Sequence, residues 1–123
     1  MLKTVHHAQI IIPSGSEDRA RDFYCGVLGI AEIEKPESLI NRGGFWLKLG
    51  DFQIHFGIDE NFDASARANS KAHLAYLVED LDNWRERLKL IDIDVIEGIP
   101  IPGYMRFEFR DPFNNRIEFL QSV

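Results

Sequence analysis

The chain is organised around one short stretch, GDFQIHFGI, at positions 50–58. Successive side chains of a strand point to opposite faces, so its apolar residues would share one face and His55 would lie in mid-strand on the other. Three further strand-like segments each carry one ionisable residue in the same way: His7, His73 and Glu118. These four strands decide both the expected fold and the expected chemistry.

The pattern of elements reads β-α-β-β-β twice along the chain. The first module spans about 5–58 and the second about 71–121, joined by a polar linker at about 59–70. A chain of 123 residues is large enough for one self-sufficient core. We therefore predict a single domain, 1–123, of the α+β class, in which two paired βαβββ modules form a half-open barrel.

The ionisable residues occupy equivalent positions in the two halves. His7 and His73 open the halves and are 66 residues apart, whereas His55 and Glu118 lie in the last strands and are 63 apart. This small difference in offset indicates an internal duplication with little residue identity. If the first and last strands pair centrally, each pair of residues would meet on the face opposite the helix.

Two helices are predicted between the strands. Ser14 and Glu17 have the spacing of a capping box, which would begin a helix that runs to about Leu28. Asp80 would cap a second helix that runs to about Leu90. The buried side of this second helix would carry four apolar residues: Leu81, Trp84, Leu88 and Ile91.

Bulk composition excludes several classes of partner. A net charge of −6 with no basic stripe argues against nucleic acid and against anionic membrane surfaces. No apolar run approaches the ~18 residues of a membrane span. Cys25 is the only cysteine, so no intrachain disulfide can form, which agrees with a cytoplasmic location. We expect a partner that is a small molecule.

Three imidazoles and one carboxylate form a donor set that suits a borderline divalent metal. Zn, Ni, Fe, Mn or Co would accept such ligands, whereas Ca and Mg prefer oxygen. The opposing interpretation is that a sheet with one solvated face also alternates apolar and polar residues. His6 would be the alternative ligand if the register of the first strand were shifted by one residue.

The whole chain, from about 5 to 121, resembles the vicinal oxygen chelate superfamily of glyoxalases, bleomycin resistance proteins and extradiol dioxygenases. The segments that carry this resemblance are HAQIII from His7, ARDFY at Ala20–Tyr24 with Leu28-Gly29, HLAYLVED at His73–Asp80, and RFEFRDPFNNRIE at Arg106–Glu118. The segments that place it nearest to a glyoxalase-like subgroup are Lys35-Pro36, RGGFW at Arg42–Trp46, and IHFGI at Ile54–Ile58.

The resemblance implies metal ligands at His7, His73 and Glu118. At position 55, glyoxalase I-like enzymes carry Glu and the related epimerase carries Gln, whereas this chain has His55. If His55 binds the metal, four protein ligands surround it. If it does not, the others form a 2-His-1-carboxylate triad of the dioxygenase type. This chain has two modules, where many extradiol dioxygenases have four.

The predicted function is a divalent-metal-dependent enzyme of the lyase or isomerase type. It would chelate a small oxygenated substrate and stabilise an oxyanion, with Glu118 and His55 as catalytic residues. Five side chains on the same faces would contact the substrate: Tyr104, Arg106, Glu108, Trp46 and Lys48. The alternatives are a metal-free protein that binds an antibiotic or toxin, and an Fe(II) ring-cleaving dioxygenase. A homodimer is expected, because half-open barrels leave strand edges to cover.

Overall fold

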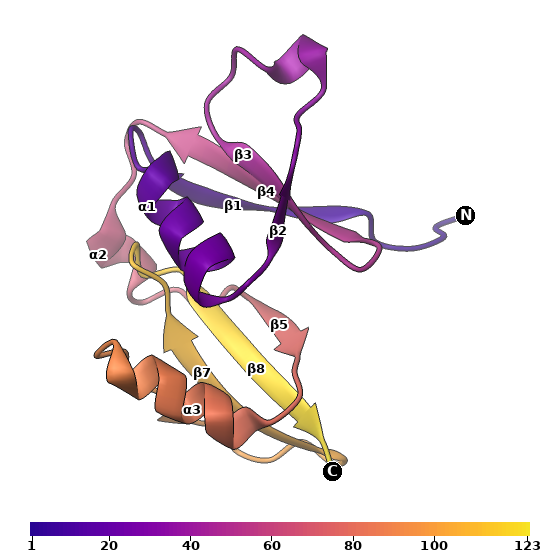
Figure 1. The fold of residues 1–123 in the computed structure, drawn as a ribbon, viewed down its shortest axis with the longest axis vertical. Helices are drawn as coiled ribbons and strands as arrows, with labels where there is room; N and C mark the ends of the chain where they lie inside the picture. The colour runs from indigo at the N-terminus through magenta and orange to yellow at the C-terminus, as the bar shows by residue number, and fades with distance from the viewer. The chain divides into compact units, whose positions relative to one another are not determined.

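Two four-stranded sheets, one in each half of the chain, carry the fold (Figure 1). The computed structural model describes residues 1–123, which separate into two units, Met1–Asp63 and Ala64–Val123. Each unit combines one open sheet with short helices, so the predicted α+β class is confirmed.

Unit 1 contains a sheet with the strand order β1-β4-β3-β2. Its elements, in chain order, are β1 (His7–Pro13), α1 (Glu17–Arg21), the π-helical η1 (Asp22–Val27), β2 (Ala31–Ile33), the 3-10 turn η2 (Glu37–Leu39), β3 (Phe45–Leu49) and β4 (Phe52–Asp59). Strand β1 runs parallel to β4, and the other neighbours are antiparallel.

Unit 2 repeats this connectivity with the order β5-β8-β7-β6. Its elements are α2 (Ala64–Arg67), β5 (His73–Leu77), α3 (Leu81–Leu90), β6 (Ile96–Glu97), β7 (Tyr104–Arg110) and β8 (Arg116–Ser122). Strand β5 runs parallel to β8, and β7 lies antiparallel between β8 and β6.

The strand register of the two sheets is the same at the positions that carry the ionisable residues. In unit 1, Gln9 pairs with His55, two residues after His7. In unit 2, Ala75 pairs with Glu118, again two residues after His73. Side chains two residues apart on a strand share a face. In both units the ionisable residues of the first and last strands are therefore diagonal neighbours on one face of the sheet.

Aromatic residues on the helical side of each sheet form its core. In unit 1, the ring of Phe56 packs against Tyr24 at 4.7 Å and against Phe45 at 4.5 Å between centroids. In unit 2, the ring of Phe119 contacts Trp84 of α3 at 5.1 Å. Burying this face against a helix leaves the opposite face of β4 and of β8, with His55 and Glu118, for other contacts.

Several local predictions are wrong. Ser14 and Glu17 do not form a capping box, because β1 continues to Pro13 and the helix begins only after Ser16. The carboxylate of Glu17 instead accepts a hydrogen bond from the backbone N–H of Gly44, at 3.4 Å. The first strands lie at the sheet edges rather than centrally, although each pairs with its last strand as expected.

Two further differences concern helices. The stretch predicted as a linker contains the single turn α2. Ile91 is 46% exposed, because α3 ends at Leu90 and the next residue leaves the helical path with φ −109°. The N-terminus of α3 agrees with the prediction, since the side chain of Asp80 accepts a hydrogen bond from Asn83 N at 3.0 Å.

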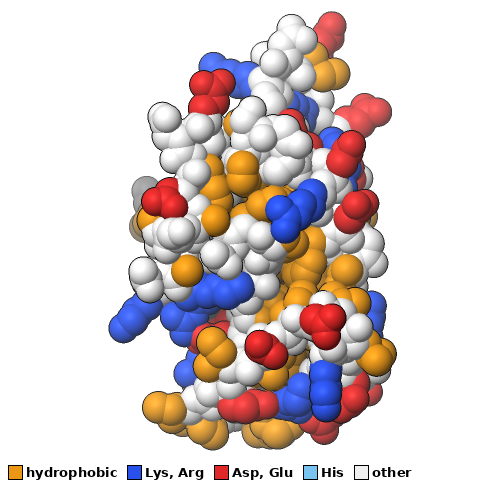
Figure 2. All heavy atoms as spheres, turned by 90° about the vertical axis from the view of Figure 1, so that its left-hand side faces the viewer, with side chains coloured by type: hydrophobic (Ala, Val, Ile, Leu, Met, Phe, Trp, Pro, Cys, Tyr) orange, Lys and Arg blue, Asp and Glu red, His pale blue; other side chains and the backbone are white.

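Charge and hydropathy show no sign of a membrane-spanning segment among the helices. None of them combines the length and the apolar character that crossing a bilayer requires. On the face drawn in Figure 2, acidic and basic side chains both occur, with a small group of basic side chains at its left edge.

Candidate functional site

Two buried carboxylates and one histidine meet on the sheet of unit 2. Glu108 of β7 and Glu118 of β8 are cross-strand partners, 6% and 5% exposed, and His73 reaches them from β5. One potential ligand atom from each of the three lies within 4.8 Å of the others. The sequence predicted His73 and Glu118 as metal ligands and placed Glu108 among the substrate contacts.

The tautomer of His73 follows from its backbone partner. Its Nδ1 lies 2.7 Å from the carbonyl oxygen of Lys71, so this nitrogen carries the proton and donates it. In the neutral ring, Nε2 then presents a lone pair, and it lies 3.4 Å from Oε2 of Glu118. Two acceptors that face each other repel unless a proton or a cation lies between them.

The separation of these two atoms fits a metal ion. Donor atoms at about 2.1 Å from a tetrahedral ion lie about 3.4 Å apart. Hydrogen bonding of the second ring nitrogen to a carbonyl is also the usual support for a metal-binding histidine. His73 Nε2 and Glu118 Oε2 therefore form a pair of donors that could hold one divalent ion.

Arginines occupy the remaining carboxylate oxygens. Arg106 Nη1 donates to Glu118 Oε1 at 2.5 Å and to Glu108 Oε1 at 3.2 Å, and its Nε donates to the carbonyl of Ile99 at 2.8 Å. Arg116 donates to the other oxygen of Glu108. Oε2 of Glu118 accepts no arginine hydrogen bond, and the hydrogen bonds of Arg106 come from Nε and Nη1, not from Nη2.

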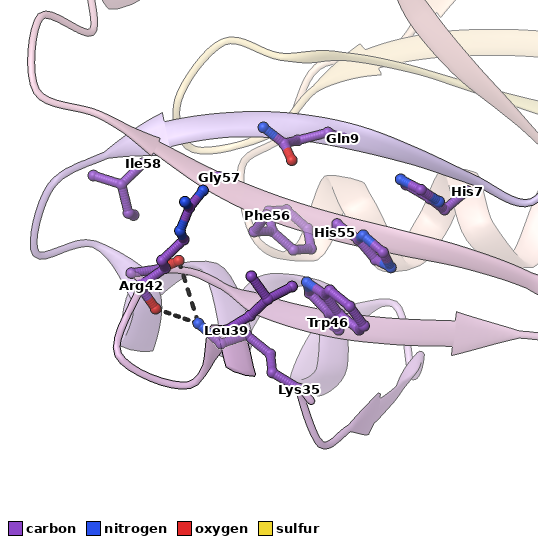
Figure 3. Close-up of a pocket in the computed structure, with 11 residues that line it drawn as sticks. His7, Gln9, Lys35, Leu39, Arg42, Trp46, His55, Phe56, Gly57 and Ile58 are labelled. Carbon is purple, nitrogen blue, oxygen red and sulfur yellow. Dashed lines mark hydrogen bonds between the residues drawn. The ribbon is translucent and has the colours of Figure 1, made fainter. Parts of the chain in front are cut away.

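In unit 1, three rings are stacked on the sheet face opposite the helix. The ring of His55 lies between those of Trp46 and His7 (Figure 3). Its centroid is 3.7 Å from that of Trp46, with 1° between the ring planes, and 4.1 Å from that of His7, with 18° between the planes. Lone pairs of imidazoles lie in the ring plane, so in this stack those of His7 and His55 run side by side rather than toward one point. Both rings could bind one ion only after one of them turned.

The protonation of His55 is fixed by its surroundings. Its Nε2 lies 2.9 Å from Oε1 of Gln53 and donates to it, which leaves the lone pair on Nδ1. Burial, followed by the nearby His7 and His6, lowers the pKa of His55 to about 4. At neutral pH the imidazole is therefore uncharged, as a metal ligand or a proton acceptor must be.

A pocket of about 490 Å³ opens beside this ring stack. His7, Trp46 and His55 line it together with side chains from the connector between β2 and β3, among them Lys35 and Arg42 (Figure 3). Sequence reasoning did not predict the last two as ligand contacts. Their only signal in the sequence was that both lie in segments that resemble the glyoxalase-like subgroup.

Two predicted substrate contacts lie away from these clusters. Lys48 is exposed on β3, where it pairs with Gln53, and it does not line the pocket. Tyr104 is 37% exposed at the start of β7, opposite Ser122. The four predicted metal ligands lie two in each unit: His7 and His55 in unit 1, His73 and Glu118 in unit 2.

Comparisons with known proteins agree on one family. Residues 4–119 match the family model for the Glyoxalase/Bleomycin resistance protein/Dioxygenase superfamily. The crystal structure of a protein assigned to the glyoxalase family, from Bacillus anthracis, is 38% identical with a TM-score of 0.88, and the match covers 100% of this chain and 98% of that one. None of the curated proteins matches at a significant level.

Two more distant structures share the fold alone. The fosfomycin resistance protein FosX from Listeria monocytogenes is 15% identical, with a TM-score of 0.75 and coverage of 100% of this chain and 96% of that one. An antibiotic-binding protein from Streptomyces sp. CB03234 is 18% identical, with a TM-score of 0.68 and coverage of 99% and 98%.

Proposed function

This chain belongs to the Glyoxalase/Bleomycin resistance protein/Dioxygenase superfamily, and on that premise we propose that it is a divalent-metal-dependent enzyme of the lyase or isomerase type acting on a small oxygenated substrate. One observation carries the proposal. Nε2 of His73 faces Oε2 of Glu118 across 3.4 Å, a distance that suits two ligands of one ion.

His73 and Glu118 would hold the ion, and His7 and His55 are also proposed as metal ligands. Zn, Ni, Fe, Mn and Co all suit imidazole with carboxylate. When bound, the ion would supply Lewis acidity to the oxygens of the substrate. The variants described below test each of the four residues.

The protein groups would orient the substrate and move its proton. Arg106 holds Glu118 through Nη1 and offers Nη2 to a carboxylate or carbonyl of the substrate. Glu118 and His55 are the proposed proton acceptors: Glu118 would act through Oε2 when that oxygen leaves the ion, and His55 through Nδ1, which is unprotonated at neutral pH. Glu108 is held on both oxygens by arginines and supports the cluster.

A metal-free binding protein is the second candidate, and the charge balance of the cluster favours it. Arg106 and Arg116 compensate the carboxylates of Glu108 and Glu118, so this cluster is neutral without a cation. An antibiotic-binding protein shares the fold. Under this proposal the chain would bind a small molecule with no chemical change.

Metal titration separates the two candidates. Chelator-treated protein would be titrated with Zn²⁺, Ni²⁺, Co²⁺ and Mn²⁺ by calorimetry, with the Co²⁺ absorption spectrum as a second readout. We expect His73→Ala and Glu118→Gln to weaken binding about 100-fold, as removal of one ligand from a small set would do. Glu79→Gln, which removes an exposed carboxylate of the same unit, is the matched control.

The outcome at the other two histidines then assigns their role. A similar loss in His7→Ala and in His55→Ala would identify both residues as metal ligands. Unchanged binding in His55→Ala would leave that residue as a base. A wild-type protein that binds none of the four ions, or a His73→Ala variant that binds them as the wild type does, would reject the metal proposal and support the binding protein.

A further inference from the structure

The pocket of unit 1 has an unusual charge for this chain. Its only charged lining residues are Lys35 and Arg42, and no carboxylate lines it, although the chain as a whole has a net charge of −6. Figure 3 shows Arg42 and the charged tip of Lys35 toward one end of the pocket and Trp46 with His55 toward the other, with the stem of Lys35 running between them. The pocket therefore has a cationic end and an aromatic end.

The cationic end is held in place by hydrogen bonds and has further N–H donors without a partner. Nζ of Lys35 donates to the carbonyl oxygens of Arg42 and Gly43, which fixes the connector and leaves its third N–H free. The guanidinium of Arg42 has no hydrogen bond or ion pair within the chain, so all five of its N–H groups can serve a ligand. A planar oxyanion is the partner that a free guanidinium binds most strongly.

The aromatic end offers a flat surface. One face of the Trp46 indole is covered by the parallel ring of His55, and no other ring or cation of the chain contacts this indole. The amide of Gln9 lies over Gly57 in the same pocket, because a Cβ at position 57 would come within 2.5 Å of Gln9 Nε2. A flat ligand could thus stack on Trp46 and meet one neutral hydrogen-bonding group on its way to the cations.

We infer that this pocket binds a small organic anion, with its oxyanion against Arg42 and Lys35 and its flat, unsaturated body on Trp46. A pocket of about 490 Å³ accommodates a molecule of this size. That the bound anion is also the substrate, and so defines the substrate class, rests on the proposed function; that the pocket binds the anion does not. Binding of the anion requires no metal and is tested without one.

Trp46 itself can report binding. The chain has two tryptophans, so Trp84→Phe leaves Trp46 as the only indole. In a chelating buffer, this variant would be titrated with benzoate, with phenyl phosphate and with the neutral benzamide. We expect saturable quenching by at least one anion and none by benzamide, since the amide has the flat ring but no charge.

A charge variant tests the assignment of Arg42. Adding Arg42→Gln should raise the Kd of the anion about tenfold or more, because it removes a charge-assisted contact. Lys89→Gln removes one positive charge from the exposed surface of α3 and should leave the Kd within a factor of about two. Equal binding of benzamide and benzoate, an unchanged Kd in Arg42→Gln, or no saturable quenching by either anion would each overturn the inference.

The two proposals fail separately. Loss of metal binding in His73→Ala concerns unit 2 and is measured without an organic ligand, whereas quenching of Trp46 is measured in chelator. If Arg42→Gln proved unfolded by circular dichroism, the comparison of benzoate with benzamide on the folded Trp84→Phe protein would still decide the inference.

Discussion

Replacing Gly44 by Ala is expected to destabilise unit 1 strongly, because this residue lies where β3 begins and passes very close to β4. Its φ of 93° belongs to the left-handed region that residues with a Cβ rarely adopt. A Cβ at this position would lie 1.8 Å from the carbonyl oxygen of Phe56 and 2.9 Å from its carbonyl carbon. Both are backbone atoms, so no side-chain rotation can relieve the overlap.

Gly15→Ala isolates the conformational part of this penalty. Gly15 has a φ of 76°, but apart from the glycine itself and its two chain neighbours no heavy atom lies within 4 Å of the position that a Cβ would take. A Cβ at positive φ costs about 1–2 kcal/mol. The restricted unfolded chain of the Ala variant offsets about 0.4–1 kcal/mol of this. We therefore expect Gly15→Ala to lower the free energy of unfolding by about 1 kcal/mol.

Gly44→Ala carries the same penalty and must also push β3 away from β4. Phe45, the next residue, stacks on Phe56 with 4.5 Å between ring centroids, and both side chains are only 2% exposed. Partial loss of this packing costs about 2 kcal/mol or more. The expected total is about 3–4 kcal/mol, which is in the range of severe single substitutions.

Urea unfolding followed by far-ultraviolet circular dichroism measures both variants against the wild type. With a slope of about 2 kcal/mol per molar urea, the midpoint should fall by about 0.5 M for Gly15→Ala and by about 1.5–2 M for Gly44→Ala. Equal losses in the two variants would refute the close approach of the two strands. A Gly44→Ala protein as stable as the wild type would refute the positive φ as well.

Three other predictions follow from single side chains. Asp111→Ala should lower the free energy of unfolding by about 3 kcal/mol, because its Oδ1 accepts two buried backbone N–H groups at 2.8 Å, whereas Asp111→Asn keeps an acceptor and should lose less in the same urea assay. Burial, and then the charge of Glu32, raises the pKa of Cys25, so less thiolate exists at a given pH, and alkylation by iodoacetamide should reach half its maximal rate at a higher pH than in a cysteine peptide. Gly57→Ala should change the urea midpoint little, because only the ends of two flexible side chains, Gln9 and Ile11, must move, but it should weaken anion binding in the Trp46 fluorescence assay.

Strand positions could be predicted from the sequence because each sheet has one face covered by helix. Period-two alternation then assigns a face to every residue, and β3, β4, β7 and β8 lie where it placed them. The start of α1 could not be predicted in this way. The spacing of Ser14 and Glu17 is compatible with a cap, but Glu17 has a partner 27 residues away in Gly44, and no local pattern reports a contact at that distance.

The connector between β2 and β3 shows that long-range contacts also limit the prediction of site residues. It has no regular period, and its path depends on hydrogen bonds from Lys35 to the carbonyls of Arg42 and Gly43. Such contacts are made by the folded backbone and leave no repeating signal in the sequence. The cationic end of the pocket was therefore missed, although three strand residues of the same pocket, His7, Trp46 and His55, were predicted as site residues.

Alternation assigns a side chain to a face but not to a direction within that face. It placed His55 on the same face as Trp46, yet only side-chain torsion decides whether the imidazole points toward an ion or lies flat on the indole. In the structure the ring is held by the parallel indole of Trp46 and by the hydrogen bond to Gln53. The pair His73 and Glu118 differs, since their donor atoms face each other directly. The geometry therefore favours the proposed metal ligands of unit 2 over those of unit 1, although the same sequence pattern predicted both pairs.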